Sequence, residues 1–244
     1  MLLVLTCSVN VSSSFTKLVN KEERIRQYVD SFLYYINHSH FTDIVICENS
    51  LFDFSSYNLT ELAKKNNKRI ELLAFKGSTD LIREKGKGFG EGEIMKHVFE
   101  NSFLLKEHSG FFKITGRVFI KNINTLIKKT IVKRNYFQQS RKRILYKIPA
   151  FDTKIYYSTK ELFKLYLIDA YKFVDDNKGD YLEYCYFNAL KKNKLAIIPF
   201  KNYPRYSGVS GSSNSPYDVS AYKYVLYFVV NLFDYLILSS KTRC

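Results

Sequence analysis

Apolar runs alternate with amphipathic stretches along the first half of the chain. Four short runs lack a helical period, which predicts buried strands at residues 2–9, 43–47, 69–75 and 110–120. Between 21 and 37 the apolar residues recur every three or four positions, so this segment is predicted to be a helix. Further helices are predicted at 58–65, from a capping box of Asn58 and Glu61, and at 91–102. This order predicts an α/β fold with a mainly parallel sheet flanked by helices.

The second half of the chain has a different pattern. A capping box of Ser158 and Glu161 predicts a helix that continues to Phe173, and another helix is predicted at 180–190. Residues 196–199 predict a short strand. The Gly/Ser-rich stretch 207–213 is long enough to act as a lid over a binding site.

The last apolar segment, residues 219–238, is predicted to be a helix with a narrow polar stripe. Its charged or amide residues, Lys223, Asn231 and Asp234, fall within roughly an 80° arc at about 100° per residue. Such a helix is either buried in the protein or laid into a membrane surface, and the pattern leaves both open. A spanning helix is not expected, because no run of about 18 purely apolar residues occurs. Residues 1–5 lack the basic flank of a signal peptide.

The charge of the chain is strongly positive, +15 over 244 residues, which predicts an anionic partner. Nucleic acid, an acidic membrane surface and phosphorylated small molecules all fit. Eight basic residues and no acidic residue lie between 128 and 147, either as a solvated basic helix or as a patch that meets anionic lipid head groups. The cysteines form no CxxC pair and the histidines show no metal spacing. We therefore expect reduced thiols in a cytosolic protein and no structural zinc.

A glycine-rich run opens the predicted helix at 91–102. Four glycines fall in the seven residues 86–92, where they allow a backbone to approach a phosphate closely. The following strand ends in Lys113, Gly116 and Arg117, which adds positive charge near the same place. Ligands of parallel sheets bind outside the carboxyl ends of the strands. The run therefore predicts a phosphate-bearing ligand at this edge.

The order of elements resembles the nucleotide-diphospho-sugar transferase fold (GT-A) from residue 2 to 122, and loosely to 217. The motifs GKGFGE, FFKITGR, FDT (151–153), YLE and YPRYSGVSGS are similar to those of small bacterial glycosyltransferases of capsule and lipopolysaccharide synthesis. The resemblance implies one domain, residues 1–218, with a nucleotide-sugar-binding half (1–122) and an acceptor-side half (123–218). The apolar helix at 219–244 follows. It also implies a nucleotide-sugar donor and a glycan or glycolipid acceptor.

The resemblance implies a role for each matching residue. The end of the first strand would line the base, and Glu48 with Asn49 would contact base or ribose. The segment 86–91 would run beneath the donor sugar and diphosphate. Glu183 would deprotonate the acceptor hydroxyl, with Asp180 as its nearest competitor. The implied donor-site residues are Thr6, Ser8, Asn10, Glu48, Asn49, Gly86, Lys87, Gly88, Gly90, Glu91, Lys113, Gly116 and Arg117.

The chain departs from the family at one point. Most GT-A enzymes carry Asp-x-Asp at the end of the fourth strand, where it holds a divalent metal. Here Lys113 and Arg117 stand in that place, so we predict a metal-independent enzyme without a cofactor, whose cations bind the leaving phosphate. An inverting transfer is expected, and a retaining one stays open because stereochemistry depends on the face that the acceptor approaches. Arg205 would add a third charge when the lid closes. A CMP-activated sugar, which leaves one phosphate, is an alternative donor. The implied acceptor or lid residues are Asp152, Arg205, Ser207, Gly208 and Ser210.

Each assignment has a structural alternative. The glycines would make a surface turn, Lys113 and Arg117 would be exposed charges on one face of an edge strand, and Glu183 would only favour a helix start. Asp152 would cap a turn instead of binding acceptor hydroxyls.

The alternatives for the whole protein are a nucleic-acid-binding module, a catalytically inactive glycosyltransferase-like subunit, and a nucleotidyltransferase. Concentration of the basic residues in one stretch, without a nucleic-acid-binding motif, argues against the first. The third would require metal-binding carboxylates. We expect a cytoplasmic enzyme, peripheral on the inner face of the cytoplasmic membrane, with no nucleic-acid partner.

Overall fold

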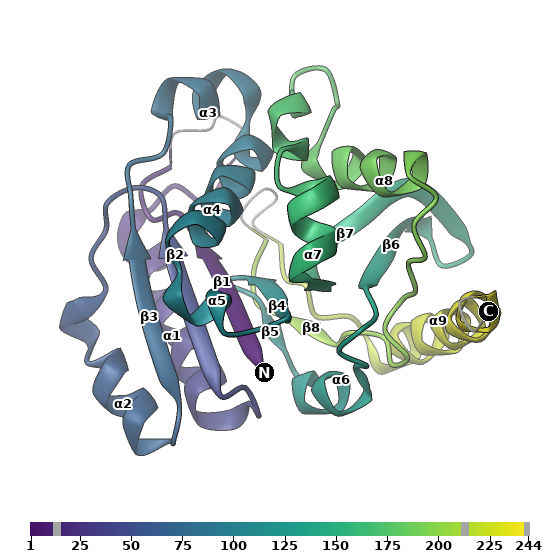
Figure 1. The fold of residues 1–244 in the computed structure, drawn as a ribbon, viewed down its shortest axis with the longest axis horizontal. Helices are drawn as coiled ribbons and strands as arrows, with labels where there is room; N and C mark the ends of the chain where they lie inside the picture. The colour runs from purple at the N-terminus through teal and green to yellow at the C-terminus, as the bar shows by residue number, and fades with distance from the viewer. Residues whose placement is uncertain (12–15, 211–214, 242–244) are drawn as a thin grey trace.

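The central feature of the computed structural model is a six-stranded sheet with helices on both faces (Figure 1). The structure describes residues 1–11, 16–210 and 215–241. The strands are β1 (Leu2–Cys7), β2 (Asp43–Glu48), β3 (Arg69–Ala74), β4 (Gly110–Thr115), β5 (Phe119–Ile120), β6 (Tyr136–Arg143), β7 (Tyr146–Thr159) and β8 (Tyr206–Ser207).

Helices occupy most of the remaining chain. The α-helices are α1 (Lys21–His38), α2 (Leu59–Lys65), α3 (Thr79–Lys85), α4 (Lys87–Asn101), α5 (Phe103–Lys106), α6 (Ile123–Lys129), α7 (Lys160–Leu162), α8 (Leu182–Lys192) and α9 (Ala221–Lys241). Three short helices of other types are η1 (Ser55–Tyr57), the π-helix η2 (Phe163–Leu167) and η3 (Ala170–Phe173).

The strand order β3-β2-β1-β4-β7-β6 places β1 in the middle of the parallel part of the sheet. The chain builds β2 and β3 on one side of β1 and then crosses to β4 on the other side. The carboxyl ends of β1 and β4 meet where Thr6 pairs with Thr115. This reversal of direction is the point at which open α/β sheets bind ligands. The predicted α/β fold with a mainly parallel sheet is confirmed.

The central strands are buried on both faces, which explains their unbroken apolar sequences. On one face, Leu3 and Leu5 of β1 pack in a core with residues of α1, α2 and α6. On the other face, Leu2 and Val4 pack with residues of α4, α5 and α8. Successive side chains of a strand alternate between faces, so β1 joins the two cores.

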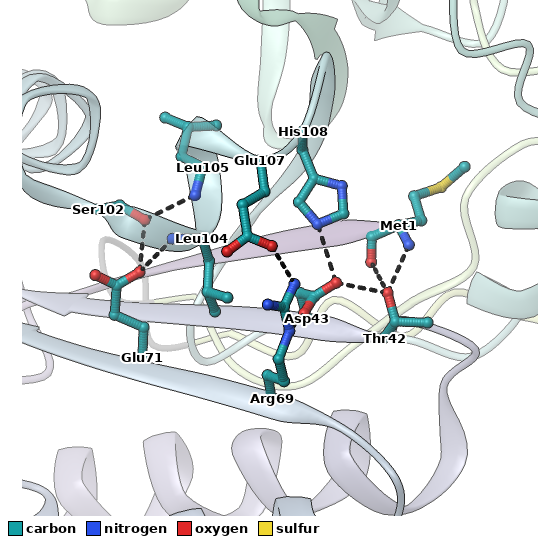
Figure 2. A network of polar contacts seen from close by, with 10 residues as sticks. All are labelled: Met1, Thr42, Asp43, Arg69, Glu71, Ser102, Leu104, Leu105, Glu107 and His108. Atoms are coloured by element: carbon teal, nitrogen blue, oxygen red, sulfur yellow. Dashed lines mark hydrogen bonds and ion pairs between the residues drawn. The ribbon is translucent and has the colours of Figure 1, made fainter.

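A polar network closes the amino edge of the sheet, away from the ligand edge (Figure 2). Asp43 of β2 accepts hydrogen bonds from Arg69, His108 and Thr42. Burial opposes ionisation of Asp43, but these bonds outweigh it and lower its pKa. The network links β2, β3 and the turn before β4.

A second carboxylate in Figure 2, buried Glu71 of β3, holds the start of α5. It accepts from the Ser102 hydroxyl at 2.7 Å and from the backbone N–H of Leu104 at 3.1 Å. The free N–H groups at a helix start need such acceptors, so Glu71 fixes α5 on one face of the sheet.

The glycine-rich run is a helix and not a loop or a surface turn. Helix α4 begins at Lys87, four residues before the predicted start, and Gly88, Gly90 and Gly92 lie in it. A Cβ on Gly92 would come within 2.0 Å of the Tyr171 Cβ, so only glycine permits this approach. The glycines therefore serve the close packing of α4.

The predicted helix from Ser158 to Phe173 is also wrong in part. Strand β7 continues to Thr159, whose hydroxyl, and not that of Ser158, caps the short α7 by accepting from Leu162 N at 3.3 Å. The rest of the segment is the π-helix η2 and the 3₁₀ helix η3. Helix α2 is found as predicted, but Asn58 has a left-handed backbone and makes no side-chain cap.

The basic run 128–147 is mainly a β-hairpin, so of its two alternatives the solvated basic helix is wrong. Helix α6 ends at Lys129, and β6 then pairs antiparallel with β7 at the edge of the sheet. The strand predicted at 196–199 is reduced to a single bridge between Ile198 and Tyr136.

The close packing of Gly92 against Tyr171 can be tested by adding a methyl group at this position. Replacing Gly92 with Ala in an open helix would stabilise it by about 1 kcal/mol. Here the new methyl group would overlap Tyr171, so we expect Gly92→Ala to lower the free energy of unfolding by about 1–3 kcal/mol. Urea denaturation measures this difference. Exposed Glu100→Ala on the same helix is the control, and equal loss in both variants would contradict the packing argument.

Candidate functional site

A cavity of about 340 Å³ opens at the carboxyl ends of β1 and β4. Its walls also come from the first turns of α4 and α8 and from β7. Half of the predicted site residues line it: Thr6, Ser8, Asn49, Lys87, Gly88, Gly90, Glu91, Arg117, Glu183 and Ser210. All but Ser210, which lies in a loop, are at or near a strand end or a helix start, as the topology requires.

The other half of the predicted residues lie outside the cavity lining among the described residues. They are Asn10, Glu48, Gly86, Lys113, Gly116, Asp152, Asp180, Arg205, Ser207 and Gly208. Residues 211–213 of the predicted lid fall outside the part of the chain that the structure describes.

Arg117 lies just after β4 and lines the cavity with only 7% of its surface exposed. Its guanidinium stacks 5.6 Å from the centre of the Tyr28 ring, and Nη1 donates to the Gln27 side chain at 3.1 Å. Its buried Nε has no hydrogen-bond partner among the described residues. No carboxylate within the described chain forms an ion pair with it, so this guanidinium is available to an anion.

Arg24 of α1 stands beside Arg117 and was missed by the sequence analysis. It is buried, and its donors are taken by the carbonyls of Ser8 at 3.0 Å and Leu18 at 3.0 Å. Arg24 thus fixes the loop that follows β1 and adds positive charge to the cavity. Its signal in the sequence is an arginine one turn before Tyr28, in line with the apolar stripe.

Lys113 does not share this role. It is fully buried, pairs with Glu91 of α4, and donates to the Thr115 hydroxyl at 3.0 Å and to the Thr153 carbonyl at 2.7 Å. Its charge is neutralised inside the protein. Lys113 faces α4 whereas Arg117 faces α1, so the expectation that both are exposed on one face of an edge strand is wrong.

Glu183, in the first turn of α8, provides a carboxylate on the opposite wall. The Thr153 hydroxyl donates to its Oε1 at 3.0 Å. Burial, and next the negative charge of Glu91, raise the pKa of Glu183. Asp180, its predicted competitor, is exposed and outside the cavity.

Asp176 is a second cavity carboxylate that sequence analysis did not assign to the site. Its Oδ2 accepts from the Lys87 N–H at 3.0 Å, which caps α4, and its Oδ1 has no partner among the described residues. Burial raises its pKa. Gly86 has a φ of +103°, and a Cβ there would lie 2.1 Å from Asp176. The absence of a side chain at Gly86 therefore leaves room for the Asp176 carboxylate to cap α4.

Lys154 of β7 is a third cavity residue that the sequence analysis missed. Its ammonium pairs with Asp152 at 2.8 Å and lies 5.4 Å from the centre of the Tyr217 ring. Burial lowers its pKa, but the charge and hydrogen bond of Asp152 outweigh burial and raise it. Asp152 therefore holds Lys154 in the cavity wall.

Other predicted residues have structural contacts instead. Glu48 accepts from the backbone N–H groups of Val9 at 2.9 Å and Phe52 at 2.8 Å, which ties the ends of β1 and β2 together. A Cβ on Gly116 would lie 2.8 Å from Thr6 O. The exposed Arg205 lies over the Tyr224 ring and away from the cavity lining.

The remaining members of the predicted set lie near the cavity without lining it. The Ser207 hydroxyl donates to Asp218 at 2.8 Å. Gly208, with φ +108°, is packed against the carbonyl of Arg117, where a Cβ would lie at 2.8 Å. Asn10 donates from its backbone to the Ser50 hydroxyl at 2.9 Å.

Charge is unevenly distributed across the cavity. The arginines lie where β1, β4 and α1 meet, whereas the carboxylates lie on the side of α4 and α8, with Lys87 and Lys154 beside them: Glu91, Asp176 and Glu183. Within the described chain, no group of three His, Cys, Asp or Glu side chains is placed to hold a metal ion. The arrangement can bind an anion at one end and accept a proton at the other.

Comparison with known proteins identifies the fold alone. No family model and no curated protein matches the chain. The galactosyltransferase LgtC, solved with donor and acceptor sugar analogues, is similar with 9% identity and a TM-score of 0.52 over 83% of this chain and 74% of that one. GlyE, a glycosyltransferase of Streptococcus pneumoniae TIGR4, has 10% identity and a TM-score of 0.58 over 98% and 63%.

A protein of another activity is also similar. A putative glucose-1-phosphate thymidylyltransferase from Bacillus anthracis, solved with sucrose, has 10% identity and a TM-score of 0.50 over 84% of this chain and 89% of that one. At such identities the likeness concerns architecture. The chain has the GT-A-like fold of nucleotide-diphospho-sugar transferases.

Proposed function

We propose that the protein is a glycosyltransferase that moves a sugar from a nucleotide-activated donor to a hydroxyl of a glycan or glycolipid. The pathway would be bacterial surface polysaccharide synthesis, in the cytoplasm at the inner face of the cytoplasmic membrane. The observation that carries the proposal is the buried guanidinium of Arg117, whose Nε lacks a partner among the described residues. It lines a cavity at the switch point of a GT-A-like sheet, opposite Glu183.

The donor would occupy the side of the cavity near β1. Thr6, Ser8 and Asn49 offer polar groups for the base and ribose. Arg117 would bind the phosphate, with Arg24 contributing charge from behind the loop. Fixed cations in a buried site stabilise a developing phosphate charge strongly, because water does not screen them there. This supports a reaction without a divalent metal.

The acceptor would bind on the side of α8. Glu183 is placed there by Thr153, and its raised pKa makes it a stronger base for a hydroxyl proton. One base and one anion site suffice for an inverting transfer. Asp176 is the alternative base, although its cap on Lys87 N gives it a structural role as well.

Donor binding tests the anion site. We expect one class among UDP-, GDP-, dTDP- and CMP-sugars to raise the melting temperature, and EDTA to leave this shift unchanged. Loss of the shift with EDTA would contradict metal independence. A melting temperature that no donor raises would contradict the proposed glycosyltransferase activity. Release of pyrophosphate from a nucleoside triphosphate and a sugar phosphate would assign a nucleotidyltransferase instead.

Arg117 can be tested separately. Arg117→Met keeps the length of the side chain and removes its charge. A hydrogen bond to a charged group contributes about 1.5–3 kcal/mol, so donor affinity measured by calorimetry should fall by about 10- to 100-fold. Arg205→Met is the matched control, because Arg205 lies on the surface over Tyr224. Equal affinities in the two variants would exclude Arg117 from the phosphate site.

Glu183→Gln tests the base. We expect transfer to slow by about 10²- to 10⁴-fold while donor affinity is kept. The folded protein favours the protonated Glu183, so its ionisation lowers stability as pH rises through the raised pKa. At pH 7 the variant should therefore melt no lower than the wild type. Transfer near the wild-type rate would exclude Glu183, and Asp176→Asn would then be examined.

The pH profile gives an independent check on the same carboxyl. The acid limb of kcat/KM should lie above the ordinary glutamate pKa of 4.5, because burial and Glu91 disfavour the charged form. The activity of the wild type should rise with pH through this limb. The limb should be absent from the pH profile of Glu183→Gln. A limb at the ordinary value would show that the ionisation of a different group controls the rate.

A further inference from the structure

Two polar residues of α9, Asn231 and Asp234, face the protein, whereas Lys223 near its start is exposed. Asn231 is buried, donates from Nδ2 to the Phe200 carbonyl at 2.7 Å, and accepts from Gln138 Nε2 at 2.8 Å. Asp234 binds both Arg141 and Lys147 of the β6–β7 hairpin. The part of the expected polar stripe formed by Asn231 and Asp234 is thus the inner side of the helix.

The opposite side of α9 is apolar and exposed. Tyr222 is 73% exposed and Phe233 62%. The exposed stripe repeats every three or four residues and consists of Tyr222, Val225, Val229, Phe233, Leu236 and Ile237. By length and composition Ala221–Ser240 could cross a membrane, contrary to the sequence-based expectation, and little of it is buried. A continuous apolar stripe of this size marks an interaction surface.

The β6–β7 hairpin lies beside α9 (Figure 1). The end of the hairpin exposes Leu145 and Tyr146. Lys142, Arg143 and Lys147 are exposed on the same hairpin, and Lys147 reaches α9 through Asp234. An apolar face bordered by cations matches the boundary between acyl chains and anionic head groups.

We propose that α9 lies flat in the head-group boundary of an anionic membrane, with its exposed stripe and the hairpin end inserted. An in-plane position keeps the contacts of Asn231 and Asp234. Crossing the membrane would break them, place Asp234 in hydrocarbon and leave the buried Arg141 without its partner. A symmetric second copy on the stripe would bring two cationic hairpins together, which argues for lipid as the occupant.

The chain contains no tryptophan, so one introduced tryptophan reports its own environment. Phe233→Trp should shift its emission to the blue with vesicles that contain phosphatidylglycerol, and much less with pure phosphatidylcholine. Salt should weaken the response, because it screens the lysines and arginines. Brominated lipids should quench the emission. Phe173→Trp is the control and should not respond, because Phe173 is even more exposed than Phe233 but lies on η3.

Sedimentation with vesicles measures the contribution of the stripe. Val229→Glu with Phe233→Glu should weaken binding to the anionic vesicles more than tenfold, whereas Phe173→Glu should not. Melting temperatures without lipid should remain similar, since the replaced side chains point away from the protein.

Three results would overturn the proposal. A Phe233→Trp emission that ignores vesicles would exclude lipid contact. A blue shift that rises with protein concentration and without lipid would assign the stripe to a second copy. Association that resists alkaline extraction would indicate a spanning helix. None of these experiments uses a sugar donor, so their failure leaves the proposed transfer reaction unaffected.

Discussion

The close approach of α4 to the sheet and to η3 is the constraint on which the cavity depends. Glycines at 86, 88, 90 and 92 remove the side chains that would hold this helix away from Asp176, Leu182, Asn49 and Tyr171. The approach places Glu91 against Lys113 and the first N–H of the helix against Asp176. Without it, the fourth strand would carry an uncompensated buried cation.

This packing also decides which cation faces the ligand. The resemblance to the GT-A fold leads one to expect acidic, metal-holding residues at the end of the fourth strand. Here Lys113 stands at that place and is held by Glu91. The guanidinium of Arg117, just after the strand, lies on the α1 side with Arg24. The cavity therefore has its two arginines on one wall, and its carboxylates on the other wall together with Lys87 and Lys154. An arginine pair at one end and carboxylates at the other suit a reaction in which one end gains negative charge while the other takes up a proton.

The sequence predicted the sheet well, because unbroken apolar strands and the striped helix α1 are local signals that burial reinforces. It also placed Thr6, Ser8, Asn49 and Arg117 at one edge of the sheet, where they line the cavity, because strand ends in a parallel sheet meet at one edge. It missed Asp176 and Lys154, which reach the cavity only through tertiary packing. The glycine run was misjudged because close helix packing overrode the low helix propensity of glycine. The basic hairpin had no alternating pattern to reveal it.

Strand β7 connects the exposed helix α9 with the cavity. Its first residues reach Asp234 of α9 through Lys147, and further along the same strand Thr153 and Lys154 enter the cavity. At about 3.3 Å per residue, the strand separates these points by roughly 20 Å. With α9 at a lipid surface, the length of β7 would set the distance from that surface to the cavity, where the proposed acceptor hydroxyl would bind. A lipid-anchored acceptor long enough to span that distance would receive the sugar, and a shorter one would remain unmodified.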